Sequence, residues 1–324
     1  MKFKALLTAD GVNLLDKRFL PAMDKVGRIC LMYLTKEHTM FLHNLSPSFG
    51  GGDGVQCIAQ FRKDVIFTDY RISSQNNDRI AFVIDIALLH RALRSAVSIL
   101  RSGGGGVGDE LHIQIKLVKK LPAGAAHALP YLSFETKGYK SAVIHDVPIS
   151  KPLSRPDVIE LQSALDASRD IPETLVQVPD MIHLQNLVDK LRNVGELLNV
   201  SITQYGDLHL HVSTSLITVG SEFRKLKVLG IRADAPNANQ NLTPSSRIET
   251  AIQRGAAQTV QVNMKHLAKS LNCHMSKPDA AFYGIAPMGA CLTMIFQFFI
   301  PGTRQMDNSI SLHCRLPVLD TGSA

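Results

Sequence analysis

A strand that runs directly into an amphipathic helix occurs twice in this chain of 324 residues, once in each half. The first copy covers residues 82–97 and the second covers residues 259–273. In both copies an apolar strand meets a helix-capping residue, Asp85 or Asn263, and leucines follow one helical turn apart. The two copies are 263 − 85 = 178 residues apart, so the same local structure is predicted in both halves.

A second repeated pattern extends the likeness beyond one helix. The spacing of four helical positions recurs at an offset of 187 − 19 = 168 residues, in Phe19, Met23, Val26 and Gly27 and in Leu187, Leu191, Val194 and Gly195. Each helix is followed by a strand-like apolar run. Two matched helix-plus-strand patterns at nearly one offset predict two copies of one domain joined end to end. The alternative is two unrelated amphipathic helices in each half, because apolar spacings also recur by chance.

The composition fits two globular domains of ordinary size. Hydrophobic residues make up 45% of the chain and charged residues 19%, which excludes a disordered or fibrous protein. The net charge of 35 − 28 = +7 permits a polyanionic partner without requiring one. The five cysteines are odd in number and mostly lie in apolar strand-like runs, so we expect reduced thiols in an intracellular protein.

Each half contains about eight or nine strand-like runs and only two helices, with short connections. This pattern predicts the α+β class, with antiparallel sheets and both helices of each domain on one face. We expect an N-terminal domain at residues 1–149, a connector at residues 150–172 and a C-terminal domain at residues 173–324.

Two segments carry more specific expectations. Pro21 lies inside a helix predicted for residues 12–26, where it should leave the Lys17 carbonyl unpaired and bend the helix. Residues 232–255 are rich in Asn, Ala, Pro and Ser, which predicts a mobile loop.

Sequence motifs for catalysis or cofactor binding are weak. Gly103, Gly105 and Gly108 match the letters of a dinucleotide-binding fingerprint, but they follow a helix and precede a strand, which is the reverse of the required order. No Gly-Lys-Ser/Thr sequence offers a P-loop. We therefore expect no nucleotide cofactor.

The histidines and cysteines also give no clear site. His209 and His211 lie on one face of a predicted strand, but no third ligand stands at metal-binding spacing, so solvated strand histidines are favoured. The cysteines of the predicted strands lack a glycine elbow or helix start that would lower a thiol pKa. We expect neither a metal site nor an enzyme, and keep as the opposing hypothesis an enzyme that binds a metal through its histidines.

The helix faces opposite the leucines carry positive charge. Arg91 and Arg94 lie on this face of the first repeated helix, and Lys265 and Lys269 on that of the second. Arg91 and Lys269 hold the same place in the repeat, since 269 − 178 = 91. Cations without base-reading side chains among them are suited to phosphate contacts that ignore sequence. An ordinary solvated helix face is the alternative.

Four short sequences, taken in order with the duplicated domain, resemble the DNA sliding-clamp family. More narrowly, the chain is similar to the Hus-type subunits of the heterotrimeric DNA-damage checkpoint clamp, the nine-one-one ring, over nearly its whole length. The matching sequences are Met1-Lys2-Phe3-Lys4 with Asp10-Gly11, Leu89-His90-Arg91-Ala92-Leu93, His145-Asp146-Val147-Pro148-Ile149 and residues 310–317.

This resemblance implies a non-catalytic nuclear subunit without a cofactor or a membrane association. Such a subunit forms a ring with two other clamp-like subunits and encircles double-stranded DNA without sequence preference. An ATP-driven clamp loader places the ring at damage sites, where it is a platform for checkpoint kinase signalling and repair enzymes. The alternative within the family is a homotrimeric replication clamp of the PCNA kind.

The resemblance also implies roles for particular residues. Ring closure by edge-strand pairing implicates His145 with its strand and the segment from Leu216 to Phe223. The residues expected to line the DNA channel are all basic and lie on or beside the predicted helices: Lys17, Arg28, Arg91, Arg94, Arg101, Lys265 and Lys269.

Overall fold

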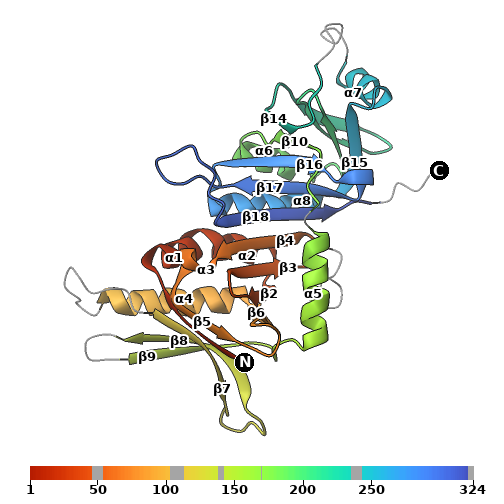
Figure 1. The fold of residues 1–324 in the computed structure, drawn as a ribbon. Coiled ribbons are helices and arrows are strands. Elements are labelled where there is room, and N and C mark those ends of the chain that lie inside the picture. The colour runs from red at the N-terminus through yellow and green to blue at the C-terminus, as the bar shows by residue number, and fades with distance from the viewer. Residues whose placement is uncertain (46–53, 103–112, 138–141, 169, 235–242, 320–324) are drawn as a thin grey trace.

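The computed structural model describes residues 1–45, 54–102, 113–137, 142–168, 170–234 and 243–319. It consists of two halves, and helix α5, which connects them along the chain, lies beside the first half (Figure 1). The strands of the first half are β1 (Lys2–Leu7), β2 (Ile29–Leu34), β3 (His38–His43), β4 (Gln56–Arg62), β5 (Phe67–Ser73), β6 (Ile80–Asp85), β7 (Ile113–Lys120), β8 (Leu129–Lys137) and β9 (Ala142–Pro148). Its helices are α1 (Ala9–Leu14), α2 (Leu20–Val26), α3 (Lys63–Ile66) and α4 (Ile86–Ser102).

The second half follows α5 (Arg155–Ala167). Its strands are β10 (Thr174–Gln177), β11 (Leu197–Thr203), β12 (Leu208–Ser213), β13 (Thr218–Phe223), β14 (Val228–Gly230), β15 (Ala257–Asn263), β16 (Ala280–Ile285), β17 (Cys291–Gln297) and β18 (Ile310–Pro317). Its helices are α6 (Met181–Leu191), α7 (Pro244–Gln253) and α8 (Met264–Leu271). No helix in the described part of the chain is long and apolar enough to span a membrane.

The two halves share one strand order. The order β5-β1-β7-β8-β9 in the first half corresponds to β14-β10-β16-β17-β18 in the second, and β4-β3-β2-β6 corresponds to β13-β12-β11-β15. All named pairings are antiparallel, including that of β4 with β18, which joins the halves through a continuous nine-stranded sheet. The duplication and the predicted α+β fold are therefore confirmed. The domain boundaries at 149/150 and 172/173 stay predictions.

The predicted repeat offsets are visible in the packing. Gly27 and Gly195, which are 168 residues apart, each lie in the connection between a helix and the strand that follows it. A Cβ atom at Gly27 would lie 2.9 Å from Cδ2 of His43, and one at Gly195 would lie 2.8 Å from Cγ1 of Val212. Both positions therefore require glycine for a close approach, which explains why glycine stands in the same place in both halves.

Pro21 is accommodated differently from the sequence-based prediction. The expected single helix is divided into α1, a π-helical turn at Leu15–Phe19, and α2. The N–H of Leu20 donates to the carbonyl of Leu15, and Pro21 then stands in the first turn of α2, where a missing N–H costs little. The structure thus divides the expected helix at a widened turn and places Pro21 just after it.

Other boundaries also differ from the predictions. The edge strand expected from Leu216 begins at Thr218. Pro244–Gln253 forms helix α7, so the prediction of a loop over residues 232–255 is wrong for this part. Thr243 caps α7 by accepting a hydrogen bond from the N–H of Ser246. Residues 235–242 lie outside the described part.

Helix α5 covers the face of the sheet opposite to α2 and α4. Alternate residues of β2 point to the two faces, so Met32 packs in the core with the helices whereas Leu31 and Tyr33 pack against α5. Val158, Leu161 and Leu165 form the apolar stripe of α5. Its N-terminus is stabilised by a capping box between Ser154 and Asp157. The connector is therefore a packed third layer (Figure 1).

We expect Leu161→Ala to lower the free energy of unfolding by about 2–4 kcal/mol, because Leu161 is 0% exposed and its loss leaves a cavity under α5. Ile159→Ala on the same helix is the control, since Ile159 is 60% exposed and should change stability by less than about 0.5 kcal/mol. Urea unfolding followed by circular dichroism measures both. Equal losses would contradict the packing of α5 on the sheet.

Candidate nucleic-acid interface

Four helices form a continuous row across both halves of the molecule. Helix α4 packs on α2, α2 lies against α8, and α8 packs on α6. The row depends on the joint between the halves, because α2 belongs to the first half and α8 to the second. It leaves one wide helical surface on the side of the sheets opposite to α5 (Figure 1).

Three of the predicted channel residues present a free charge on this surface. Arg91 of α4 and Lys269 of α8 are exposed and lie at corresponding places in the two halves. Lys17 is exposed on the π-helical turn that precedes α2. Within the described residues, none of these three forms an ion pair.

Three other predicted channel residues are exposed but paired with carboxylates. Nε of Arg28 lies 2.7 Å from Asp85, and Nε of Arg94 lies 3.7 Å from Asp16. Nζ of Lys265 lies 3.8 Å from Glu196. Their charges are therefore partly compensated within the chain. Arg101 falls in the last turn of α4, but its side chain lies outside the described part.

Asp85 supports the surface by fixing the start of α4. Its carboxylate accepts a 3.0 Å hydrogen bond from the N–H of Leu88 and a 2.7 Å bond from Nε of Arg28. Burial opposes ionisation of Asp85, but these two donors outweigh it and hold the pKa of Asp85 below its usual value. Asn263 has the corresponding role in the second half, where its side chain accepts from the N–H of Lys265.

A polar recess lies between α2 and α4. His90 stands at its side, with Nε2 within 2.9 Å of the Asp16 carbonyl oxygen and 3.0 Å of the Asp16 carboxylate. Arg91 supplies a free guanidinium group there, whereas Arg94 is paired with Asp16 and the hydroxyls of Ser95 and Ser98 already have hydrogen-bond partners. The polar lining of the recess consists of Asp24, His90, Arg91, Arg94, Ser95 and Ser98.

The two strands expected at subunit contacts are both sheet edges. β9 pairs with β8 alone and β13 with β12 alone among the named strands of the described chain. His145 on β9 is half-buried and its Nε2 lies 2.8 Å from Oγ of Ser95. Phe223 ends β13 opposite Leu208, whereas Leu216 is 94% exposed in the preceding turn and lies outside the strand.

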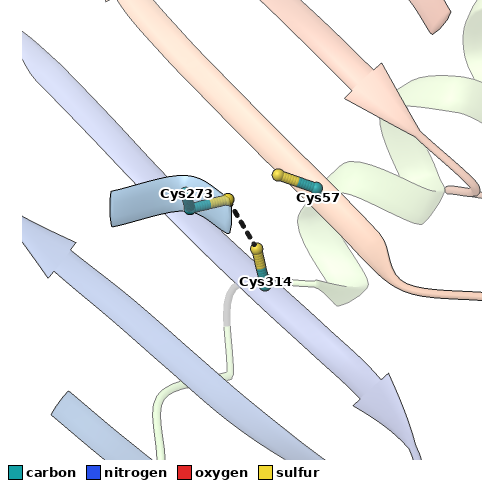
Figure 2. Close-up of side chains that lie close together, drawn as sticks. All are labelled: Cys57, Cys273 and Cys314. Atoms are coloured by element: carbon teal, nitrogen blue, oxygen red, sulfur yellow. Dashed lines mark hydrogen bonds between the residues drawn. The ribbon is translucent and has the colours of Figure 1, made fainter. Parts of the chain in front are cut away.

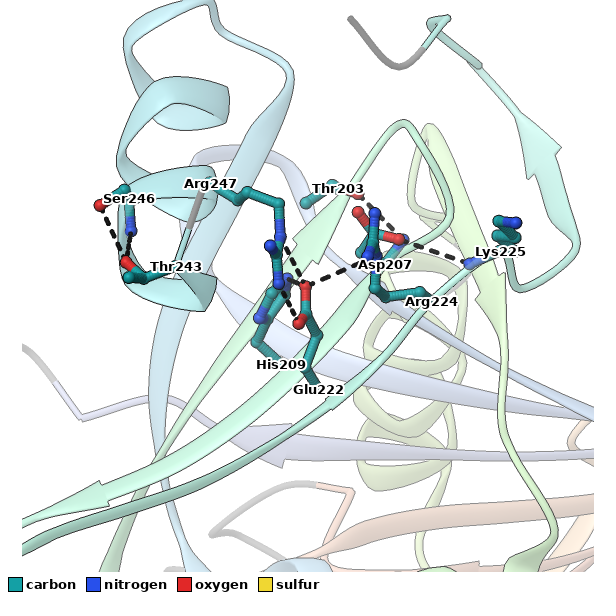
Figure 3. A network of polar contacts seen from close by, with 9 residues as sticks. All are labelled: Thr203, Asp207, His209, Glu222, Arg224, Lys225, Thr243, Ser246 and Arg247. Carbon is teal, nitrogen blue, oxygen red and sulfur yellow. Dashed lines mark hydrogen bonds and ion pairs between the residues drawn. The ribbon is translucent and has the colours of Figure 1, made fainter. Parts of the chain in front are cut away.

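A buried ionic network lies on β13 and shows where the prediction of solvated histidines was wrong. His209 is only 3% exposed, and its Nε2 lies 3.5 Å from the carboxylate of Glu222 on β13. Arg247 of α7 donates to the same carboxylate from Nε and from a terminal nitrogen (Figure 3). Burial lowers the pKa of His209 against the opposing effect of Glu222, so a neutral imidazole is favoured.

The same network limits metal binding there. Asp207, His209 and Glu222 place three donor atoms within 4.8 Å of one another. However, both oxygens of Glu222 already accept hydrogen bonds from Arg247, which a metal ion would have to displace. The arrangement therefore anchors α7 to the edge strand β13. The sequence gives little warning of it, because Arg247 lies in a segment whose composition predicts a loop.

Comparison with known proteins agrees with this architecture. The model of the family described as "Hus1-like protein" matches residues 1–304. A checkpoint protein hus1 homologue from Dictyostelium discoideum is 25% identical over 282 residues, covering 86% of this chain and 88% of the relative. The crystal structure of proliferating cellular nuclear antigen from Entamoeba histolytica superposes with a TM-score of 0.58 at 9% identity, covering 98% of both chains. The structural match therefore supports the fold alone.

Asp85→Ala should lower the free energy of unfolding by about 1–2 kcal/mol at pH 7, because it removes the cap of α4. Asp85→Asn keeps an oxygen acceptor, as Asn263 does in the second half, and should cost less.

The pH dependence of stability distinguishes the contribution of the Asp85 charge from the contribution of its side chain as the cap of α4. A lowered folded-state pKa makes the charge of Asp85 stabilising above its unfolded pKa of about 3.9. That stabilisation is lost as the pH falls through the folded-state value. The stability of Asp85→Asn should therefore converge on that of the original chain in acid, measured by urea unfolding at pH 7 and pH 3. If the difference in unfolding free energy between Asp85→Asn and the original chain is the same at pH 7 and pH 3, the charge of Asp85 does not contribute to stability.

Proposed function

The chain belongs to the Hus1-like family, and from this premise we propose that it is one subunit of a heterotrimeric clamp that encircles double-stranded DNA at sites of damage. A relative 25% identical is named as a checkpoint protein, which favours a checkpoint role over a replication clamp made of three identical chains. The observation that carries the proposal is the row of four helices, with free cations at matching places in both halves.

The chemistry of this surface supports DNA binding without sequence preference. Arg91 and Lys269 are exposed on helices α4 and α8, and Lys17 is exposed on the turn before α2. Such side chains reach phosphate oxygens, while reading bases would require side chains placed in a groove. Arg28, Arg94 and Lys265 would contribute less, because each has a carboxylate partner. We propose Arg101 as a further contact by its place in α4.

The joint inside the chain supports a scheme for the joints between subunits. β4 and β18 pair with Cys57 opposite Cys314. Their counterparts in the other half are β13 and β9, and each of these two strands ends its sheet. In the repeat, His145 corresponds to Cys314, because the bridge Ile84–Ile149 of the first half corresponds to the bridge Val262–Val318 of the second. By the pairing of the neighbouring strands, Gly220 corresponds to Cys57. We propose that β9 pairs with the strand of one neighbouring subunit that is equivalent to β13. On the other side of the chain, β13 pairs with the strand of the second neighbour that is equivalent to β9.

The remaining parts of the proposal follow from family membership. The subunit is non-catalytic and acts in the nucleus with two different clamp-like subunits. A clamp loader places the ring, and checkpoint and repair proteins bind to it.

Reversing both free helix charges, with Arg91→Glu and Lys269→Glu, should weaken DNA binding by the assembled ring. Each lost phosphate contact should reduce the slope of log K against log salt by roughly 0.9. The control is Arg155→Glu, an exposed cation of α5 on the opposite side of the sheet. Titrations over a range of salt concentrations measure the slope. An unchanged slope with an intact ring would place the DNA elsewhere.

Size-exclusion chromatography with light scattering tests the assembly. We expect the chain to form a ring of one copy each with two different clamp-like subunits. Ile144→Asp on the open edge β9 should prevent this assembly, and Ile159→Asp, equally apolar and exposed on α5, should not. A stable trimer of this chain alone would instead favour the replication-clamp alternative.

A further inference from the structure

Three buried thiols meet where the two halves of the chain join. Cys57 on β4 and Cys314 on β18 stand opposite each other in the ladder that crosses the joint. Cys273 approaches them from a 3₁₀ segment, Asn272–Ser276, that follows α8 (Figure 2). Sγ of Cys273 lies 3.6 Å from Sγ of Cys314, and all three sulfur atoms lie within 4.8 Å of one another. Each of the three residues is 0% exposed.

These separations match those of a metal-thiolate site. A Zn–S bond of about 2.3 Å at tetrahedral angles places two coordinating sulfur atoms about 3.8 Å apart. The three sulfur atoms would need only small side-chain movements to reach this spacing. Sδ of Met23 lies 3.8 Å from Sγ of Cys57 and adds a fourth, weaker soft donor beside them.

Tyr283 lies on the same face of the sheet as Cys314, because Tyr283 pairs with Met294 and Met294 pairs with Cys314. Its hydroxyl is buried and has no hydrogen-bond partner in the described structure. Burial raises the pKa of Tyr283, with added effects from the neighbouring Cys314 and Cys273, so the group is a neutral O–H donor. A buried donor without an acceptor is costly, and a thiolate sulfur held by a metal ion would be an acceptor.

We propose that Cys57, Cys273 and Cys314 together bind one Zn²⁺ ion that ties the two halves of the chain to each other. Each thiol releases its proton to solvent as its sulfur–zinc bond forms. Three thiolates with a dication leave a net charge of −1, which a hydrogen bond from Tyr283 would stabilise. Cu⁺ is equally thiophilic, but it would leave −2 in a buried site, so Zn²⁺ is favoured.

Disulfide formation accounts less well for the same cluster. Thiol oxidation proceeds through an accessible thiolate. All three residues are 0% exposed, so none of them is accessible to an oxidant in solution. A disulfide would also leave the third thiol and Tyr283 without new partners.

Elemental analysis of the full-length, untagged chain tests the proposal, after expression with added zinc and purification under a phosphine reductant. We expect one Zn²⁺ per chain and at least a tenfold loss of occupancy in Cys57→Ser and Cys314→Ser. Cys291→Ser is the control, since its thiol is half-buried and lies outside the cluster. Copper in place of zinc, or a metal content equal in all variants, would overturn the assignment.

Tyr283→Phe provides a test that does not remove a ligand. In zinc-loaded protein it should weaken zinc binding by about 10–100-fold, as loss of an outer-shell partner does. In metal-free protein it should leave the melting temperature unchanged or raise it, because an unpaired hydroxyl is removed. A fall in melting temperature of equal size with and without zinc would show that Tyr283 acts only in packing. If the chain contains no bound zinc, either after expression with added zinc or after refolding with zinc present, the site is refuted.

Discussion

The pairing of β4 with β18 is the constraint on which the rest of the structure depends. It continues one sheet from the second half into the first, and thereby fixes where the two sets of helices meet. Other contacts reinforce it. Nε of Arg18 donates to the Ser276 carbonyl at 2.7 Å, and the ring of Phe19 lies 5.4 Å from that of Phe298. Without the pairing, α2 and α8 would not be neighbours and the helical surface would be divided.

The two sides of the sheets have different chemistry. On one side the helices bury apolar stripes and expose cations, some free and some paired with carboxylates. On the other side α5 packs on an apolar surface in the first half, while α7 packs on the second half over a polar surface that contains His209 and Glu222. The duplicated domain has thus kept its strand order and its helix row, whereas the outer coverings of its two copies differ in residue type.

The sequence predicted features that depend on local periodicity. Helix caps at Asp85 and Asn263, the leucine stripes and the repeat offsets depend on residues a few positions apart, and they led to the fold class and to the free cations at Arg91 and Lys269. Contacts between distant residues were missed. Asp16 is 78 residues from Arg94, so nothing in the local pattern indicated that it would compensate that arginine. Helix α7 was missed for a related reason, since Arg247 ties it to Glu222, which is 25 residues away in the chain. The cluster of Cys57, Cys273 and Cys314 was likewise not predictable from local patterns, because these residues meet only where the two halves join.

The folded connector has a mechanical consequence. The 13 residues of α5 span about 20 Å as a helix, but would reach about 43 Å if extended. Unwinding them would lengthen the tether between the halves, yet it would first strip Leu161 and its apolar neighbours from the sheet. Helix α5 therefore acts as a second connection beside the β4–β18 ladder, and it cannot lengthen without leaving the sheet. Any tension applied along the chain would be borne by both elements together.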